Sequence, residues 1–141
     1  MVCDATVLER NLNLVLQITQ ITERVVVCAN LMDEARRKRI EVDQAELERE
    51  LGVPVVMTAA REGQGLDELV ERIHAVASGE LRVQPTPVTF DAEFESAVAE
   101  LAGELAELLP GRSYTRWLAA RLLDGDERIR EALRTGELAR S

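Results

Sequence analysis

Apolar residues follow two alternating patterns through the first 79 positions of the chain. Short runs rich in β-branched residues are typical of strands that helices cover on both faces. Two such runs occur, at Val25–Ala29 and Val53–Met57, and we interpret Val2–Ala5 as the end of a third strand. After each of them, apolar residues recur three and four positions apart, which indicates amphipathic helices. The alternation predicts an α/β unit in which crossover helices join about three parallel strands.

Polar residues and glycines mark the expected ends of these helices. Thr6 and Glu9 have the spacing of a capping box at the start of the first helix. Asp43 opens the next helix that we expect and Gly52 closes it, while Gly79 ends the following one. These local signals agree with the hydrophobic pattern.

The pattern lapses between residues 80 and 88, where Pro85 and Pro87 favour an extended connector. Everything beyond this interval has the periodicity of helices. The sequence therefore predicts an α/β domain at residues 1–79, a connector at 80–88 and a small all-helical domain at 89–141.

The helical part carries one long apolar stripe, from Phe94 to Leu108, which must be buried against another surface. Ser113 can cap a second helix and Asp126 a third. Gly125 stands where a helix-ending glycine is expected between them.

Charge and composition exclude several classes of protein. The chain carries 26 acidic and 17 basic side chains, a formal charge of −9, which disfavours attraction to nucleic acids or anionic lipid. No apolar run approaches the roughly 18 residues of a membrane span, and the first residues do not resemble a secretory signal. Cys3 and Cys28 lie in apolar runs, where reduced cysteine packs as a small hydrophobe. We expect a cytoplasmic protein without nucleic acid partners or direct membrane insertion.

Asn30 and Asp33 come directly off the end of a predicted parallel strand, where ligands of open α/β sheets bind. A carboxylate there can accept hydrogen bonds from the N1 and N2 hydrogens of guanine, and adenine offers no such pair. The asparagine can tie neighbouring loops together. The alternative interpretation is that both residues only shape the turn from strand to helix.

The loop from Thr58 to Gly65 follows the next strand and has small residues at its start and two glycines near its end. Such a loop allows backbone N–H groups to approach a ligand oxygen closely. Together, the two loops have the composition of the guanine-binding half of a GTPase.

Segments on both sides of the connector resemble FeoB, the bacterial ferrous iron transport protein B. In the first domain the resemblance rests on Cys3–Leu12, Asn30–Lys38, Val53–Val56 and Thr58–Arg61. In the second it rests on Arg116–Ala119 and Arg121–Asp126. The same order of motifs recurs in both parts, which makes the resemblance specific. It implies a partial P-loop GTPase-like fold, with parallel strands flanked by helices, followed by the start of the family's helical domain.

The resemblance also assigns binding residues. The asparagine and aspartate that bind guanine in the family's fourth motif correspond to Asn30 and Asp33. The alanine whose backbone N–H meets the guanine O6 in the fifth motif corresponds to Ala60, in one loop with Thr58 and Ala59. Ala59 replaces a serine that is usual in the family, so a supporting side-chain hydrogen bond is lost while the backbone donor stays.

The sequence lacks the Gly-Lys-Ser or Gly-Lys-Thr of a phosphate loop, and its only lysine is Lys38. The lysine of such a loop reaches the β and γ phosphates. By resemblance, the chain corresponds to the family's fourth to sixth strands without the switch segments or the membrane domain. We therefore expect weak binding of the guanine base of GTP or GDP, no Mg²⁺ site, and no GTP hydrolysis by this chain alone, in a protein implicated in ferrous iron transport.

A second function from a different class stays open, that of a non-catalytic interaction or regulatory module. The apolar stripe from Phe94 to Leu108 would then pack on a partner. The strand at Val2–Ala5, without a neighbour on its outer side, favours association as well. The expected protein partners are a second copy of the chain and the membrane domain of the transporter.

Overall fold

The computed structural model describes residues 1–140, and side chains through residue 138. The chain divides into two compact units, Met1–Pro87 and a second unit from Val88 onward. Each unit has a hydrophobic core of its own.

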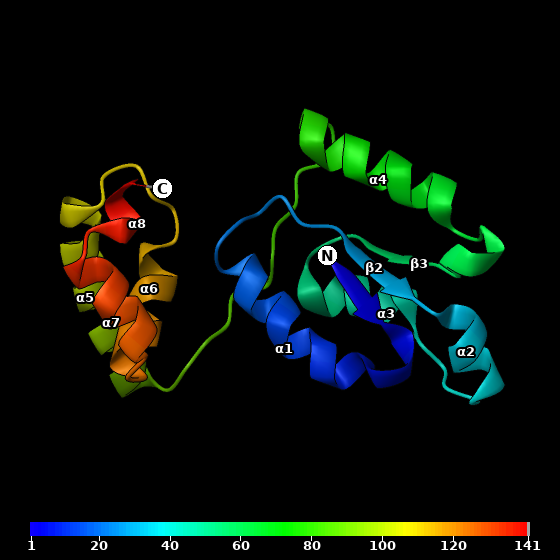
Figure 1. Cartoon of the computed structure of the whole chain (residues 1–141), viewed down its shortest axis with the longest axis horizontal. Helices are drawn as coiled ribbons and strands as arrows, with labels where there is room; N and C mark the ends of the chain where they lie inside the picture. Colours follow the sequence, from blue (N-terminus) through cyan, green and yellow to red (C-terminus); the bar gives the residue numbers. More distant parts are fainter. Residues whose placement is uncertain (141) are drawn as a thin grey trace. The chain divides into compact units, whose positions relative to one another are not determined.

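A three-stranded parallel sheet lies at the centre of the first unit (Figure 1). Its strands are β1 Val2–Asp4, β2 Val27–Asn30 and β3 Val55–Met57, in the order β1-β2-β3. Cys3 pairs with Ala29, and Cys28 pairs with Val56. The predicted α/β architecture is confirmed, although the strands are shorter than the apolar runs. Because all three strands run in one direction, their carboxyl ends meet at the same edge of the sheet.

Two helices cover one face of this sheet, α1 (Leu8–Thr19) and α3 (Gln44–Leu51) (Figure 1). Val15, Val27 and Val55 meet there and are almost fully shielded from solvent. Burying a valine side chain stabilises a fold by about 1.5 kcal/mol or more. This packing fixes the two helices against the strands.

A single helix, α4 (Leu66–Ser78), covers the opposite face (Figure 1). Val26, Val56 and Val76 form the cluster beneath it. Successive strand residues point to opposite faces, so the continuous apolar runs that predicted buried strands serve both helix layers.

The start of α1 differs from the prediction. The Oδ1 atom of Asp4 accepts a hydrogen bond from the Thr6 N–H at 2.7 Å and caps a 3₁₀ turn, η1 (Ala5–Val7). Thr6 therefore lies inside a turn and cannot cap the helix, which begins at Leu8 without a side-chain cap. The predicted capping box with Glu9 is wrong because the Asp4 carboxylate accepts the Thr6 N–H and starts a 3₁₀ turn before the helix.

The other predicted ends of helices in this unit are present. The Asp43 carboxylate accepts the Glu46 N–H at 2.9 Å and caps α3. Gly52 ends α3 and Gly79 ends α4, both with positive φ. At Gly52 a Cβ would lie 2.1 Å from the Gln84 carbonyl oxygen, so only glycine allows this close approach.

The interval 80–88 contains no helix or strand. It is nevertheless anchored to the first unit, since Val83 packs against the core. The Thr86 N–H donates to the Leu51 carbonyl at 3.0 Å. These contacts hold the chain as far as Thr86 against the first unit.

The second unit is helical. Its described helices are α5 Ala92–Leu108, α6 Thr115–Leu123, α7 Glu127–Arg134 and α8 Glu137–Arg140. Val98 and Leu105 of α5 are buried with Leu118 of α6. The predicted stripe is thus covered within its own unit, and only its last member, Leu108, is 72% exposed because Leu109 takes the buried place.

Caps in this unit were predicted with mixed success. Asp126 caps α7 through its carboxylate, and Gly125 has the predicted positive φ. Ser113 does not cap α6, because that helix begins at Thr115 after Tyr114 and has no side-chain cap.

An ion pair joins α6 to the first residues of the unit. Both terminal nitrogens of Arg116 donate to the Glu95 carboxylate, at 2.8 and 2.9 Å, and one of them also donates to the Val88 carbonyl at 3.1 Å. The Phe90 N–H donates to the same carboxylate at 2.8 Å. These hydrogen bonds lower the pKa of Glu95 and raise that of Arg116.

Candidate functional site

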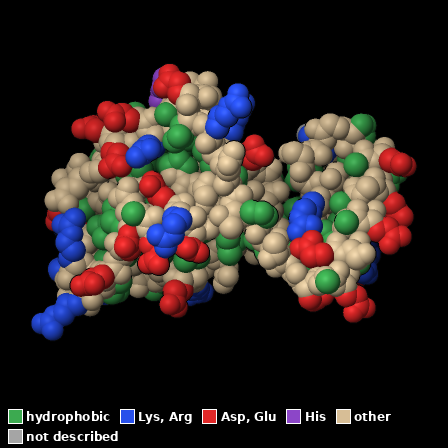
Figure 2. Space-filling model, turned by 180° about the vertical axis from the view of Figure 1, so that it is seen from behind, with side chains coloured by type: hydrophobic (Ala, Val, Ile, Leu, Met, Phe, Trp, Pro, Cys, Tyr) green, Lys and Arg blue, Asp and Glu red, His purple; other side chains and the backbone are tan. Residues whose placement is uncertain are grey.

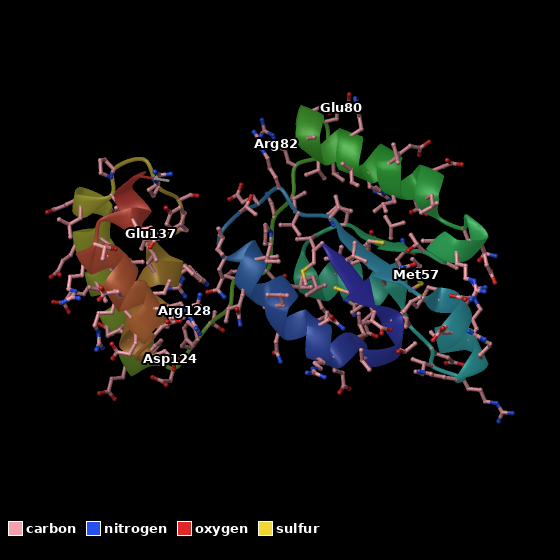
Figure 3. All side chains as sticks on the ribbon, in the orientation of Figure 1. Met57, Glu80, Arg82, Asp124, Arg128 and Glu137 are labelled. Carbon is pink, nitrogen blue, oxygen red and sulfur yellow. The ribbon has the colours of Figure 1, made fainter. Side chains whose placement is uncertain are left out.

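The carboxyl ends of β2 and β3 bring the predicted site residues together. Asn30 is the last residue of β2. Thr58 directly follows Met57, the last residue of β3, which is labelled in Figure 3. The Thr58 N–H donates to the Ala29 carbonyl at 2.9 Å. The Thr58 carbonyl in turn accepts the Met32 N–H at 3.1 Å. These backbone hydrogen bonds join the two loops directly after the strands.

One side chain links the loops a second time. The Asn30 Oδ1 atom accepts hydrogen bonds from the Thr58 hydroxyl at 3.0 Å and from the Ala60 N–H at 3.1 Å. The Thr58 hydroxyl also lies 3.2 Å from the Cys28 sulfur, and Thr58 is 1% exposed. Asn30, which is partly exposed, and the buried Thr58 therefore form a polar link between the two loops.

A sharp turn at Leu31 places Asp33. Leu31 has a φ of 67°, in the left-handed region, and precedes the short helix α2 (Met32–Arg37). Non-glycine residues rarely adopt this conformation, which costs about 1 kcal/mol. Met32 and Ala35 are buried against Ala5 and hold α2 to the unit. Asp33 consequently lies in the first turn of α2, beside the loop that follows β3.

The Oδ1 atom of Asp33 is buried and has no hydrogen-bond partner in the described residues. A buried carboxylate oxygen without a donor is unfavourable by about 1–3 kcal/mol or more. Such an atom is suited to a ligand that brings its own N–H groups. This unpaired oxygen belongs to the aspartate that the sequence singled out.

The loop after β3 closes on itself. The N–H groups of Ala59 and Gln64 each donate to the other residue's carbonyl, at 3.1 and 3.2 Å. Between them lies a 3₁₀ turn, η2 (Ala60–Glu62). Gly65 completes the loop, where a Cβ would lie 2.3 Å from the Met57 carbonyl oxygen. Ala59 is 1% exposed, whereas Ala60 faces solvent.

The Ala60 N–H is not free, because it donates to Asn30. We expected this N–H to be open to a ligand oxygen, and in the structure a ligand would have to share it or displace Asn30 from it. The sequence could not reveal this internal hydrogen bond, which depends on the distance between two loops.

A cavity of about 480 Å³ lies beside Asp33. Its lining residues are Asp33, Arg36, Arg37, Arg61 and Glu62. They come from α2 and η2, so the cavity joins the two predicted loops. Of the predicted site residues only Asp33 lines it, whereas Asn30, Thr58, Ala59 and Ala60 do not.

Sequence reasoning missed one contact that shapes this site. A terminal nitrogen of Arg36 donates to the Gln64 side-chain oxygen at 3.1 Å and links α2 to the end of the second loop. Residues 36–39 are all basic, a pattern that does not by itself indicate a contact with a distant loop. All four residues are exposed.

Neither metal-binding clusters nor membrane-spanning helices occur among the described residues. No group of three or more histidine, cysteine, aspartate or glutamate side chains could hold a metal ion there. None of the described helices is both long and apolar enough to cross a bilayer. Acidic side chains are visible on both units (Figure 2), as the net charge of −9 predicts.

Two family models match the chain. The model described as ferrous iron transport protein B matches residues 1–73, and that of the FeoB cytosolic helical domain matches residues 90–140. The matches fall on either side of the connector.

Longer relatives of this chain are also named FeoB. An Fe(2+) transport protein A/Fe(2+) transporter FeoB fusion protein of Porphyromonas gingivalis is 34% identical over 91% of this chain. The Fe(2+) transporter FeoB of Salmonella typhimurium is 33% identical over 89% of it. The chain spans 16% of the length of each of these relatives.

Solved structures agree in fold. The cytosolic domain of the T. maritima FeoB iron transporter in a GDP form has a TM-score of 0.81 and 27% identity, covering 92% of this chain and 51% of that one. A mutant of S. thermophilus NFeoB bound to GMPPNP has a TM-score of 0.80 and 26% identity, covering 92% and 49%. With the two matching family models, these similarities show that the chain belongs to the ferrous iron transport protein B family.

Proposed function

We propose that this chain forms the guanine-binding part of a GTPase that serves ferrous iron transport. The observation that carries the proposal is the buried, unpartnered Oδ1 atom of Asp33 beside a cavity. The N1 and N2 hydrogens of guanine would supply the donors that this carboxylate lacks. Adenine would leave the oxygen unpaired, so the same atom would discriminate between the two bases.

The remaining residues would position the base rather than react with it. Asn30 would hold the loop after β3 in place, because both hydrogen bonds that its Oδ1 accepts come from that loop. The Ala60 N–H would donate to the guanine O6, shared with or released by Asn30. Thr58 would support Asn30 from below, and Ala59 would keep the loop closed.

The relatives support this ligand class, since one similar structure is a GDP form and another is bound to GMPPNP. For this chain we propose recognition of the base alone, because its only lysine, Lys38, lies at the exposed end of α2. We expect a dissociation constant of about 1 mM or weaker for GDP, near −4 kcal/mol. We also propose that the chain has no Mg²⁺ site and does not hydrolyse GTP on its own.

Titration of the chain with GDP, followed by NMR, tests the proposal. Asp33→Ala removes the free acceptor and should abolish the shifts of the Ala60 and Arg61 amides. Glu62→Ala serves as the matched control, because Glu62 lines the same cavity and has no assigned contact with the base. GDP-induced shifts of the Ala60 and Arg61 amides that persist in Asp33→Ala at parental size would refute the assignment.

A second proposal concerns partners. β1 forms one edge of the sheet, and its Val2 side chain is 68% exposed, so we propose that this edge associates with a second copy. A Val2→Lys variant should then sediment as a monomer where the parent chain forms dimers. A parent chain that is monomeric at all concentrations contradicts this proposal.

Association through the helical stripe lacks such support because the stripe is covered by α6. The membrane domain of the transporter remains a proposed partner, as the family resemblance implies.

A further inference from the structure

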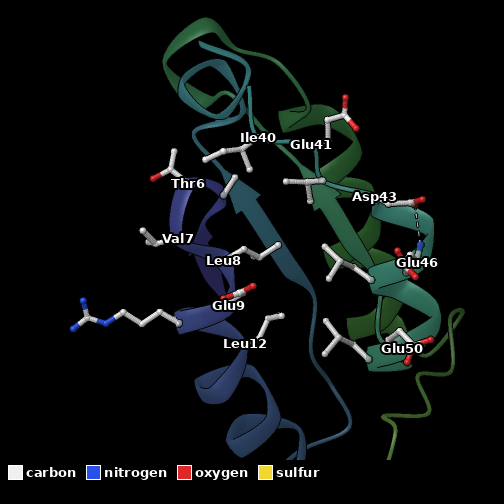
Figure 4. Close-up of a pocket in the computed structure, with 15 residues that line it drawn as sticks. Thr6, Val7, Leu8, Glu9, Leu12, Ile40, Glu41, Asp43, Glu46 and Glu50 are labelled. Atoms are coloured by element: carbon white, nitrogen blue, oxygen red, sulfur yellow. Dashed lines mark hydrogen bonds between the residues drawn. The ribbon is translucent and has the colours of Figure 1, made fainter. Parts of the chain in front are cut away.

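A larger groove lies on the first unit, away from Asp33. It runs between η1 with the start of α1 on one side and residues 40–51 on the other (Figure 4). Its volume is about 810 Å³. None of the residues around Asp33 line it, so its role does not depend on the guanine site.

The floor of the groove is apolar. Leu8 and Leu12 lie on the side of α1 that faces α3 (Figure 4), and Leu47 and Leu51 come from α3. Leu8, Leu12 and Leu47 are only partly buried, so apolar surface remains open to water between the two helices. Contiguous apolar surface of this kind is characteristic of binding grooves.

The rim of the groove is acidic. Its carboxylates are Glu9, Glu41, Asp43, Glu46 and Glu50, against a single basic lining residue, Arg10. Arg49 lies 3.5 Å from the Glu46 carboxylate and 3.4 Å from that of Glu50. Within the described part of the chain, Glu9 and Glu41 have no ion-pair partner.

The apolar floor and the acidic rim together limit the class of ligand that the groove can bind. The carboxylates are spread around the groove and form no metal-binding cluster in the described residues, which disfavours a single metal ion. The acidic rim would repel anionic ligands and acidic protein surfaces. An extended ligand with apolar side chains and several positive charges matches both the floor and the rim.

We infer that this groove binds a cationic amphipathic helix of another protein. Its apolar side chains enter between Leu8, Leu12 and Leu47, and its lysines or arginines pair with Glu9 and Glu41. An amphipathic helix laid in an apolar groove is a recurrent mode of recognition. The charges at the rim set its orientation and accelerate its association.

A model peptide of about 15 residues, built from leucine and lysine at helical spacing, tests this inference. Titrated into the intact chain, it should shift the methyl resonances of Leu8, Leu12 and Leu47. A Glu9→Lys/Glu41→Lys variant should bind on the order of tenfold more weakly at low salt. Both substituted residues are exposed, and Glu9 lies in the first turn of α1, where its negative charge stabilises the helix by up to about 1 kcal/mol. The variant should therefore stay folded with only a small decrease in melting temperature.

A matched control variant distinguishes peptide binding in the groove from binding elsewhere on the chain. A Glu68→Lys/Glu71→Lys variant reverses two exposed charges on α4 and should bind the peptide nearly as tightly as the parent. If both variants weaken peptide binding equally, the net charge of the chain determines the binding and the inference is overturned. Shifts confined to Val70 and Ile73 of α4 would place the peptide on another surface and would also overturn it. A dimer of the chain that Glu9→Lys/Glu41→Lys dissociates would assign the groove to self-association instead.

Discussion

The Asn30 side-chain oxygen accepts a hydrogen bond from the Thr58 hydroxyl, with 3.0 Å between the two oxygens and 28 positions between the residues in sequence. This hydrogen bond joins the end of β2 to the loop that follows β3. The same oxygen holds the Ala60 N–H at 3.1 Å. The position of the second loop therefore depends on one amide group, and the base-recognition proposal depends on that position.

Removing the Thr58 hydroxyl should weaken the fold. Thr58→Val keeps the size of the side chain but withdraws the donor to Asn30, in a site that is 1% exposed. We expect a loss of about 1 kcal/mol in the free energy of unfolding, measured with urea. Thr86→Val is the control, because Thr86 is exposed and its hydroxyl can be replaced at little cost. Equal stability of the two variants would show that the buried link contributes nothing.

The two glycines of the loop should respond differently to alanine. Both have positive φ, but a Cβ at Gly65 would meet the Met57 carbonyl oxygen at 2.3 Å, whereas nothing lies within 4 Å of one at Gly63. Gly63→Ala should cost about 1–2 kcal/mol of backbone strain. Gly65→Ala should cost more, because the backbone must move as well, and thermal unfolding measures the difference. Identical melting temperatures would contradict the close approach at Gly65.

Much of the first unit could be predicted because hydrophobic periodicity determines it. The runs around Val27 and Val55 predicted parallel strands that are buried on both faces, and Asp43 predicted the start of α3. Thr6 and Ser113 failed as caps, because competing local hydrogen bonds and turn geometry decide between neighbouring candidates. Sequence could not resolve such competition over two or three residues.

Low pH should destabilise the second unit through Glu95. Its hydrogen bonds to Arg116 hold its pKa below the ordinary value of 4.5, so the folded state binds the proton less readily than the unfolded chain does. The resulting stabilisation is complete above pH 4.5 and is lost as the pH falls through the lower pKa of the folded state. Circular dichroism melts from pH 7 to 3 should show a decline in melting temperature in this range, since Asp126, whose pKa is also lowered, adds to it.

Glu95→Gln should lower the melting temperature at pH 7 and flatten the decline at acid pH. Glu107→Gln, on the exposed part of the same helix, should leave the parent profile unchanged. A parent-like pH profile in Glu95→Gln would exclude the ion pair with Arg116 as its cause.

The candidate site was only partly accessible to sequence reasoning. The placement of Asn30 and Asp33 after a parallel strand predicted that they would meet the loop of Thr58 to Ala60, because strand ends share one edge. The engagement of the Ala60 N–H by Asn30 and the bond between Arg36 and Gln64 could not be predicted. Both depend on the separation of two loops to within an ångström, which no local pattern specifies.

The base preference of an Asp33→Asn variant tests the central claim most directly. Xanthine carries an oxygen where guanine carries its N2 amino group, so an amide at this position would donate to xanthine, whereas the natural carboxylate accepts from guanine. NMR titrations with GDP and XDP should show the parent chain favouring GDP on the order of tenfold, and the variant favouring XDP. The same base preference in both proteins would contradict recognition of guanine by Asp33.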